Sequence, residues 1–106
     1  MLDLDEVVTC PPVVQEVLQG FRDEWAFRLA RASMLALPIV DAPLPLARFE
    51  EAAQLYRAAR RAGLTLRSGV DCLIAASAIR HQLTVLHVDR DFPKLARVAA
   101  LDERKL

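Results

Sequence analysis

Glycine is scarce in this sequence, with three residues among 106, and the formal charges sum to zero. So little glycine, together with a hydrophobic content of 54%, excludes a disordered chain and favours a compact, helix-rich globule. No glycine-rich loop is present, so an unrelated phosphate-binding α/β domain has no support. The length suffices for one hydrophobic core, and we expect residues 1–106 to form a single domain.

Cysteine is also scarce. Cys10 and Cys72 lie far apart among apolar neighbours and lack the spacing of metal ligands, so we expect two small core residues in a reducing compartment. The acidic opening of the chain has no basic region of a signal peptide, and no apolar run approaches the length of a transmembrane helix. The sequence therefore predicts a cytoplasmic protein without a membrane partner.

Lysine contributes little to the positive charge, because twelve arginines stand beside Lys94 and Lys105 alone. The planar guanidinium fork suits phosphate and carboxylate, so this bias permits an RNA or an acidic protein as partner. A GC-rich genome explains the same bias equally well. The zero net charge argues against general electrostatic binding of nucleic acid.

Hydrophobic patterning divides the chain into alternating short strands and helices. Strands are expected at residues 6–9, 37–40 and 83–88. Helices are expected at residues 13–20, 21–36, 45–62, 69–81 and 91–98. This order predicts an α/β fold, a sandwich with a short parallel sheet.

Two of the expected helices carry an apolar face. In the helix over 21–36 this face consists of Phe21, Trp25, Leu29 and Ala32. In the helix over 45–62 the residues expected to point inward are Leu46, Phe49, Ala52, Ala53, Tyr56 and Ala59. Gly63 is expected to end the second of these helices in a left-handed conformation.

The stretch from Arg67 to Arg80 places a single acid, Asp71, at the start of an otherwise apolar helix. Ser68 and Asp71 fit a capping box, in which the acid serves the helix terminus. A carboxylate in the first helical turn also points to the edge of the sheet, so a role as ligand is compatible with capping.

Three further acids lie near expected strand and helix boundaries. Glu16 interrupts an apolar helical segment and either faces water or belongs to a site. Asp89 and Asp91 follow the last expected strand; Asp91 is alternatively the N-cap of the next helix, and Asp89 a loop acid paired with Arg90. The two histidines are weak candidates, because His81 reads as a cation at a helix end and His87 as a strand residue beside the acids.

These acids are expected to converge, because ligands of parallel α/β sheets bind beyond the carboxyl ends of the strands. Clustered carboxylates repel one another unless cations neutralise them. Oxygen ligands without histidine or cysteine favour Mg²⁺ or Mn²⁺. A metal held in this way can polarise a phosphodiester and activate water for attack.

The motifs around these acids resemble the PIN-domain ribonucleases, and most of all the VapC-type toxins of bacterial toxin–antitoxin pairs. The motifs are Glu16 in Val-Gln-Glu-Val-Leu-Gln-Gly, Asp71 in Asp-Cys-Leu-Ile-Ala-Ala, and residues 89–92 as Asp-Arg-Asp-Phe. The resemblance implies a three-layer α/β/α sandwich and a Mg²⁺- or Mn²⁺-dependent endoribonuclease, usually dimeric and held inactive by a VapB-like antitoxin.

Carried over by motif, the resemblance assigns catalytic and metal-binding roles to Glu16, Asp71 and Asp89, with Asp91 as an accessory ligand. Arg67 and Arg90 are the candidate contacts to RNA phosphates. Members of the family open with a central strand that ends in an Asp followed by Ser or Thr, and these 106 residues contain no such strand. Asp3 and Asp5 precede the first expected strand and are not expected to replace that acid.

The sequence thus looks like a PIN domain without its first strand, with three acids in place of four. We expect weaker metal binding and low or absent nuclease activity. Strand edges left unpaired would favour either a dimer formed by exchange or a marginal, rearranged monomer. The alternative function is a catalytically inactive PIN remnant that binds an antitoxin or a second copy of itself.

Overall fold

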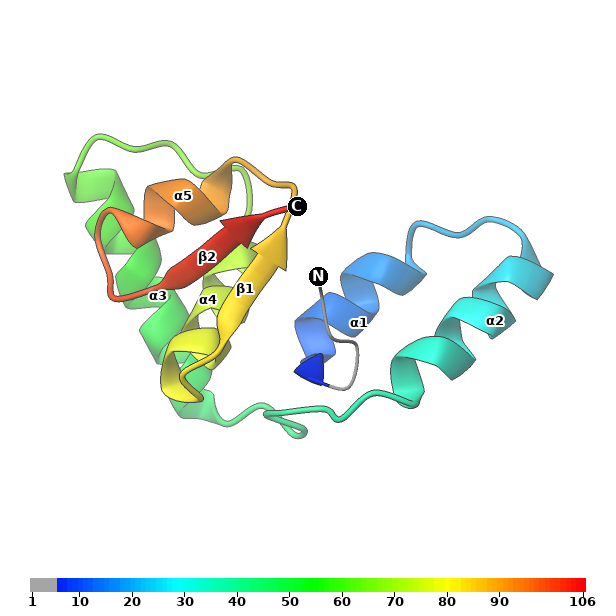
Figure 1. Ribbon diagram of the computed structural model, residues 1–106. Coiled ribbons are helices and arrows are strands. Elements are labelled where there is room, and N and C mark those ends of the chain that lie inside the picture. Colours follow the sequence, from blue (N-terminus) through cyan, green and yellow to red (C-terminus); the bar gives the residue numbers. More distant parts are fainter. Residues whose placement is uncertain (1–5) are drawn as a thin grey trace. The chain divides into compact units, whose positions relative to one another are not determined.

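The computed structural model describes residues 6–106, which form two compact units divided between Leu44 and Pro45. The first unit contains helices α1 (Pro11–Leu18) and α2 (Glu24–Leu35) (Figure 1). The second contains α3 (Leu46–Arg61), α4 (Gly69–Arg80), β1 (Thr84–His87), α5 (Asp91–Ala96) and β2 (Asp102–Lys105). The predicted α/β fold with a short parallel sheet is confirmed, since β1 and β2 pair in parallel.

The first unit forms almost no sheet. Residues 6–9 and 37–40, both predicted as strands, pair only through a parallel bridge between Thr9 and Ile39. The Thr9 amide donates to the Pro38 carbonyl (2.9 Å) and the Val40 amide donates to the Thr9 carbonyl (2.8 Å). Pro11 and Pro38 bring no N–H donors that could lengthen the ladder, so the predicted strands shrink to one bridge.

Helix α1 begins at two prolines, where the missing N–H groups cost no helical hydrogen bond. Helix α2 begins at Glu24, three residues later than predicted, because the Asp23 carboxylate accepts the Ala26 amide (2.8 Å) and caps the helix there. The apolar face predicted for this helix exists but is uncovered. Trp25 is 69% exposed and Leu29 is 54% exposed.

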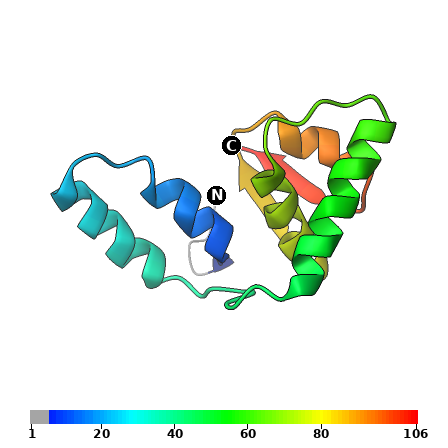
Figure 2. The same ribbon diagram turned by 180° about the vertical axis from the view of Figure 1, so that it is seen from behind.

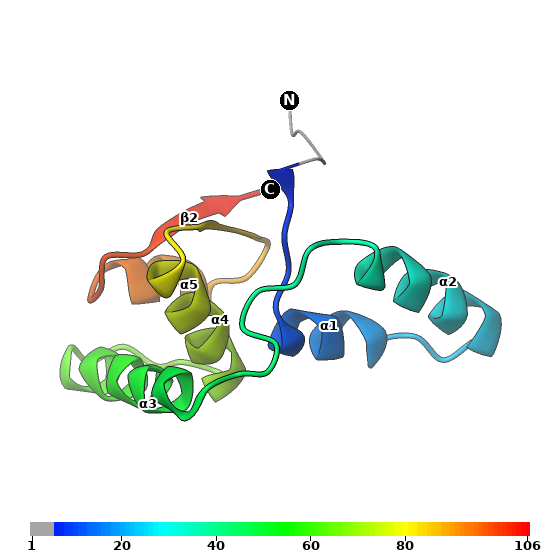
Figure 3. The same cartoon turned by 90° about the horizontal axis from the view of Figure 1, so that it is seen from below.

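In the second unit, α3, α4 and α5 lie on one side of the β1–β2 sheet, as the views in Figures 1 and 3 agree. Strand β2 pairs residue by residue with β1, from Thr84 opposite Asp102 to His87 opposite Lys105. Strand β2 was not predicted, because Asp-Glu-Arg-Lys has neither apolar alternation nor β-branched residues. Backbone pairing with a buried neighbour makes it a strand.

The core of the second unit lies where α3 packs against α4, side by side in Figure 2. Ala59 and Ala75 are fully buried there, and their small side chains let the two helices approach closely. Leu46 and Phe49 were wrongly predicted to point inward, since they are 71% and 47% exposed. Helical spacing shows which residues share a face but not how far a neighbouring helix covers it.

Two further predictions are confirmed. Gly63 follows the C-terminus of α3 with a φ of 76°, a left-handed conformation that glycine adopts at least cost. Both cysteines are buried, and burial is the main cause that raises the pKa of the Cys72 thiol to about 11. Across residues 6–106, none of the helices has the length and apolar character that spanning a membrane requires.

Candidate metal centre

Asp71 stands in the first turn of α4. Ser68 is the N-cap of this helix, and its hydroxyl accepts the Val70 amide (3.1 Å). Ser68 therefore caps α4 as predicted, although the hydroxyl of a capping box would accept the amide of Asp71, one residue further along. Asp71 is only 9% exposed as a residue, and it lies among further buried residues of the helix.

Asp89 and Asp91 follow β1 as predicted, with Val88 between the end of the strand and Asp89. Asp91 is not an N-cap; it is the first residue of α5, and its amide donates to Asp89 Oδ1 (2.9 Å). Asp89 thereby satisfies an N–H group that the start of a helix leaves open. The ion pair of Asp89 is with Arg67 rather than with the predicted Arg90.

The three acids meet at one place in the second unit. One carboxylate oxygen from each of Asp71, Asp89 and Asp91 lies within 4.8 Å of the others. Asp91 is fully buried, and its Oδ1 has no hydrogen-bond partner. Because a buried carboxylate oxygen without a hydrogen bond is costly, Asp91 Oδ1 and the neighbouring oxygens of Asp71 and Asp89 fit a hard divalent cation.

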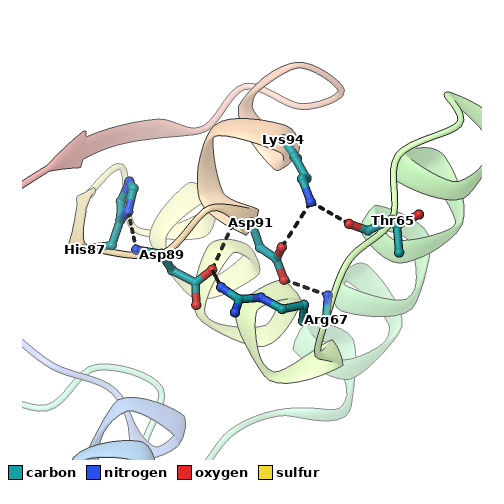
Figure 4. A network of polar contacts seen from close by, with 6 residues as sticks. All are labelled: Thr65, Arg67, His87, Asp89, Asp91 and Lys94. Atoms are coloured by element: carbon teal, nitrogen blue, oxygen red, sulfur yellow. Dashed lines mark hydrogen bonds and ion pairs between the residues drawn. The ribbon is translucent and has the colours of Figure 1, made fainter.

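Among residues 6–106, the cationic side chains of Arg67 and Lys94 reach the same cluster (Figure 4). Arg67 Nη2 lies 3.1 Å from Asp89 Oδ1, while the Arg67 backbone amide donates to Asp91 Oδ2 (2.8 Å). Lys94 Nζ lies 3.6 Å from Asp91 Oδ1 and donates to the Thr65 carbonyl (2.7 Å). Arg67 and Lys94 thus contribute positive charge beside Asp89 and Asp91.

The surroundings of Asp89 keep it ionised. The hydrogen bond from the Asp91 amide is the largest cause that lowers the pKa of the Asp89 carboxyl, and Arg67 lowers it further. Partial burial acts in the opposite direction but does not prevail. Asp89 is therefore a carboxylate at neutral pH, the form that coordinates metal ions.

A buried histidine, His87, contacts the backbone of Asp89. His87 Nδ1 accepts the Asp89 amide (3.1 Å), and His87 Nε2 lies 2.7 Å from Glu103 Oε1 on β2. Because Nδ1 accepts, the ring proton sits on Nε2 and is donated to Glu103. His87 lies beside the acids, as predicted. The role of Glu103 was missed, because a charged C-terminal segment reads as solvated surface.

The remaining predicted residues are not part of the group of Asp71, Asp89 and Asp91 found among residues 6–106. Glu16 is exposed on α1 of the first unit, where its carboxylate lies 3.5 Å from Gln19 Nε2. Arg90 is exposed in the loop between β1 and α5. His81 is the C-cap residue of α4 and so lies at the helix end, as predicted. Asp3 and Asp5 lie outside the described residues.

The acid cluster, the parallel strands and the motif order point to one class of protein. The chain belongs to the PIN-domain family, whose model, described as "PIN domain", matches residues 1–98. This match confirms the family that the three motifs predicted.

Within this family the chain is similar to VapC ribonucleases. It is 41% identical over 95 residues to ribonuclease VapC11 of Mycobacterium tuberculosis and to VapC ribonuclease Mb1587 of Mycobacterium bovis. The matched segment covers 90% of this chain and 70% of each relative. The resemblance to the VapC type is thereby confirmed as well.

Two solved structures share the fold. VapBC2 from Rickettsia felis, bound to a promoter DNA fragment, matches 93% of this chain and 74% of its own with a TM-score of 0.73 and 18% identity. FitAB, bound to a DNA fragment, matches 98% of this chain and 76% of its own with a TM-score of 0.65 and 21% identity. At these identities the likeness concerns the fold alone.

Proposed function

We propose that this chain is a VapC-type endoribonuclease that depends on Mg²⁺ or Mn²⁺ and acts as the toxin of a VapBC-type pair. The observation that carries the proposal is the cluster of Asp71, Asp89 and Asp91, whose buried member has an oxygen without a hydrogen-bond partner. Membership of the PIN-domain family and the identity to VapC ribonucleases support the same activity.

The three aspartates would hold the metal, and Glu16 is proposed as a further acid of the site. Held by these acids, a divalent ion would supply the polarisation of the scissile phosphodiester and the activation of water. The Arg67 amide donates to the Asp91 carboxylate, and the His87 ring accepts the backbone amide of Asp89, so the Asp91 carboxylate and the Asp89 backbone are held before substrate arrives. Arg67 and Arg90 are the proposed contacts to RNA phosphates, because a guanidinium group suits phosphate oxygens.

The test is Mn²⁺-dependent cleavage of a single-stranded RNA by the wild type and by Asp71→Asn. We expect the variant to lose at least about 100-fold in cleavage rate, the scale of an electrostatic group removed from a reacting centre. Glu50→Gln, which removes an exposed carboxylate of α3, is the matched control and should cleave as the wild type does. Equal cleavage by wild type and Asp71→Asn would contradict the metal site.

A VapB-like antitoxin and a second copy of the chain are the proposed partners, and both units are proposed to form one PIN domain. The second candidate function is an inactive PIN remnant that only binds such a partner. The exposed face of Phe21, Trp25 and Leu29 favours it, because uncovered aromatic surface is typical of docking sites. A chain that self-associates but neither binds Mn²⁺ nor cleaves RNA would support the remnant.

A further inference from the structure

Arg67 contacts two of the three clustered acids by different parts of the residue. Its backbone amide donates to Asp91 Oδ2, and its guanidinium pairs with Asp89 Oδ1 at 3.1 Å (Figure 4). The amide contact belongs to the loop that precedes α4 and would survive any substitution of the side chain. The guanidinium contact depends on the side chain alone.

The two cations at the cluster differ in how firmly they are held. Lys94 is 35% exposed, and its ammonium group is fixed by the Thr65 carbonyl 2.7 Å away. The Arg67 side chain is 68% exposed, and among the described contacts its guanidinium pairs only with Asp89. Lys94 is therefore a fixed part of the cluster, whereas the Arg67 guanidinium can leave at the cost of one solvent-screened ion pair.

We propose that Arg67 is a built-in competitor of the divalent cation at Asp89, and that its guanidinium moves to an RNA phosphate when metal holds the cluster. This inference rests on the proposed metal-dependent function and adds a residue that sets metal affinity and couples it to substrate binding. The Asp89 carboxylate and an RNA phosphate each present a pair of oxygens to the planar guanidinium group, so the Arg67 side chain suits either of them.

Charge explains the competition. A guanidinium within hydrogen-bond distance of Asp89 repels a dication that approaches the same carboxylate, and it occupies a lone pair of Oδ1. Its exposure screens the effect, so removing the charge should tighten metal binding by roughly three- to tenfold. A purely structural Arg67 would instead leave the cluster less ordered when removed and would weaken metal binding.

The first experiment measures Mn²⁺ affinity by calorimetry for the wild type and Arg67→Gln, with Arg67→Lys and Arg90→Gln as matched variants. Arg67→Gln should bind Mn²⁺ roughly three- to tenfold more tightly, while Arg67→Lys stays near the wild type because it keeps the charge. Arg90→Gln removes the same charge next to Asp89 without removing an ion pair to it, and should change the affinity less than about twofold.

The outcomes separate the two proposals. If the wild type and Arg67→Gln both fail to bind Mn²⁺, the proposed metal site is wrong and this inference falls with it. If the wild type binds Mn²⁺ and Arg67→Gln binds it equally or more weakly, only the inference is overturned. An equal gain in Arg90→Gln also overturns it, because the effect would then be general charge rather than the pair with Asp89.

The second experiment uses fluorescence anisotropy of a short single-stranded oligodeoxynucleotide as a phosphate probe. With saturating Mn²⁺, Arg67→Gln should bind the probe about fivefold more weakly than the wild type, the loss of one charge-assisted phosphate contact. Without divalent cation the two proteins should bind it alike, because the wild-type guanidinium pairs with Asp89. An equal loss with and without Mn²⁺ would overturn the movement of Arg67.

Discussion

At the scale of single residues, the site combines a buried acid with a partly exposed one. Asp91 is fully buried and is fixed by the Arg67 amide, whereas the Asp89 side chain is 35% exposed and can still change partners. The sequence predicted both acids, because they follow a buried strand directly. It also gave Arg67 as a candidate contact to RNA phosphate, but it could not predict the ion pair with Asp89, since the two residues are 22 positions apart and meet only through packing of the chain.

Asp89 should make stability depend on pH in acid. Its pKa is lower in the folded chain than in an unfolded one, mainly because the Asp91 amide donates to it, so the ionised form favours folding. This contribution is complete above the unfolded value of about 3.9 and is lost as the pH falls through the lower folded value. Urea unfolding at pH 6 and at pH 3 should show a difference between wild type and Asp89→Asn that shrinks in acid.

The matched control for this titration is Asp102→Asn, which removes an exposed carboxylate at the start of β2. Its difference from the wild type should stay small at both pH values. If the free energy of unfolding of the wild type exceeds that of Asp89→Asn by the same amount at pH 6 and at pH 3, ionisation of Asp89 is not the cause of the difference.

At the scale of elements, helices were predicted well and strands poorly. Helix α4 was expected over 69–81 and spans Gly69–Arg80, because Ser68, apolar spacing and a good N-terminus are all local features. Strand β2 was not expected, because a strand at the edge of a sheet is defined by its partner rather than by its own side chains. The contact of Glu103 on β2 with His87, which supports the site, could therefore not be predicted from the sequence either.

Glu103→Ala should destabilise the protein by removing the acceptor of a buried histidine. His87 Nε2 would lose its 2.7 Å contact, and a typical hydrogen bond of this kind contributes about 1 kcal/mol to the free energy of unfolding. Urea unfolding measures this loss, and the Asp89 amide resonance should shift because His87 Nδ1 holds that amide.

Lys105→Ala, which removes an exposed side chain of the same strand, is the control and should change the free energy of unfolding by less than about 0.5 kcal/mol. Should Glu103→Ala leave both the stability and the Asp89 resonance unchanged, β2 would have no part in supporting the acids.

At the scale of the whole molecule, each unit shows a different balance of core and surface. The second unit has a core cluster that includes Ala59, Ala75 and Leu95, all fully buried. In the first unit, α2 has no buried residue, and its apolar face is uncovered. Such a face is a poor contributor to folding and a good candidate for contact with a partner.

Trp25→Glu should therefore weaken association while leaving folding almost unchanged. Trp25 is 69% exposed, so the free energy of unfolding should change by less than about 0.5 kcal/mol. A charge placed in the centre of the apolar α2 face should disfavour self-association. Under conditions in which the wild type self-associates, sedimentation velocity should therefore give a lower average mass for Trp25→Glu. Trp25→Phe keeps an aromatic ring and should behave as the wild type.

If the wild type self-associates and Trp25→Glu shows the same mass distribution, the contact lies on another surface. A large loss of stability would instead show that Trp25 is covered within the folded chain.

The sequence by itself determined the helices, the positions of Asp71, Asp89 and Asp91, and the family, because helical spacing, caps and motif order are local properties of the chain. The tertiary structure alone decided which charges meet these acids. Arg67 lies 22 positions from Asp89, and His87 lies 16 positions from Glu103, so both pairs form only through folding of the second unit. Lys94 is three positions from Asp91, but the Thr65 carbonyl that fixes its ammonium group is 29 positions away. Contacts of this kind depend on packing and strand pairing, for which no local pattern exists.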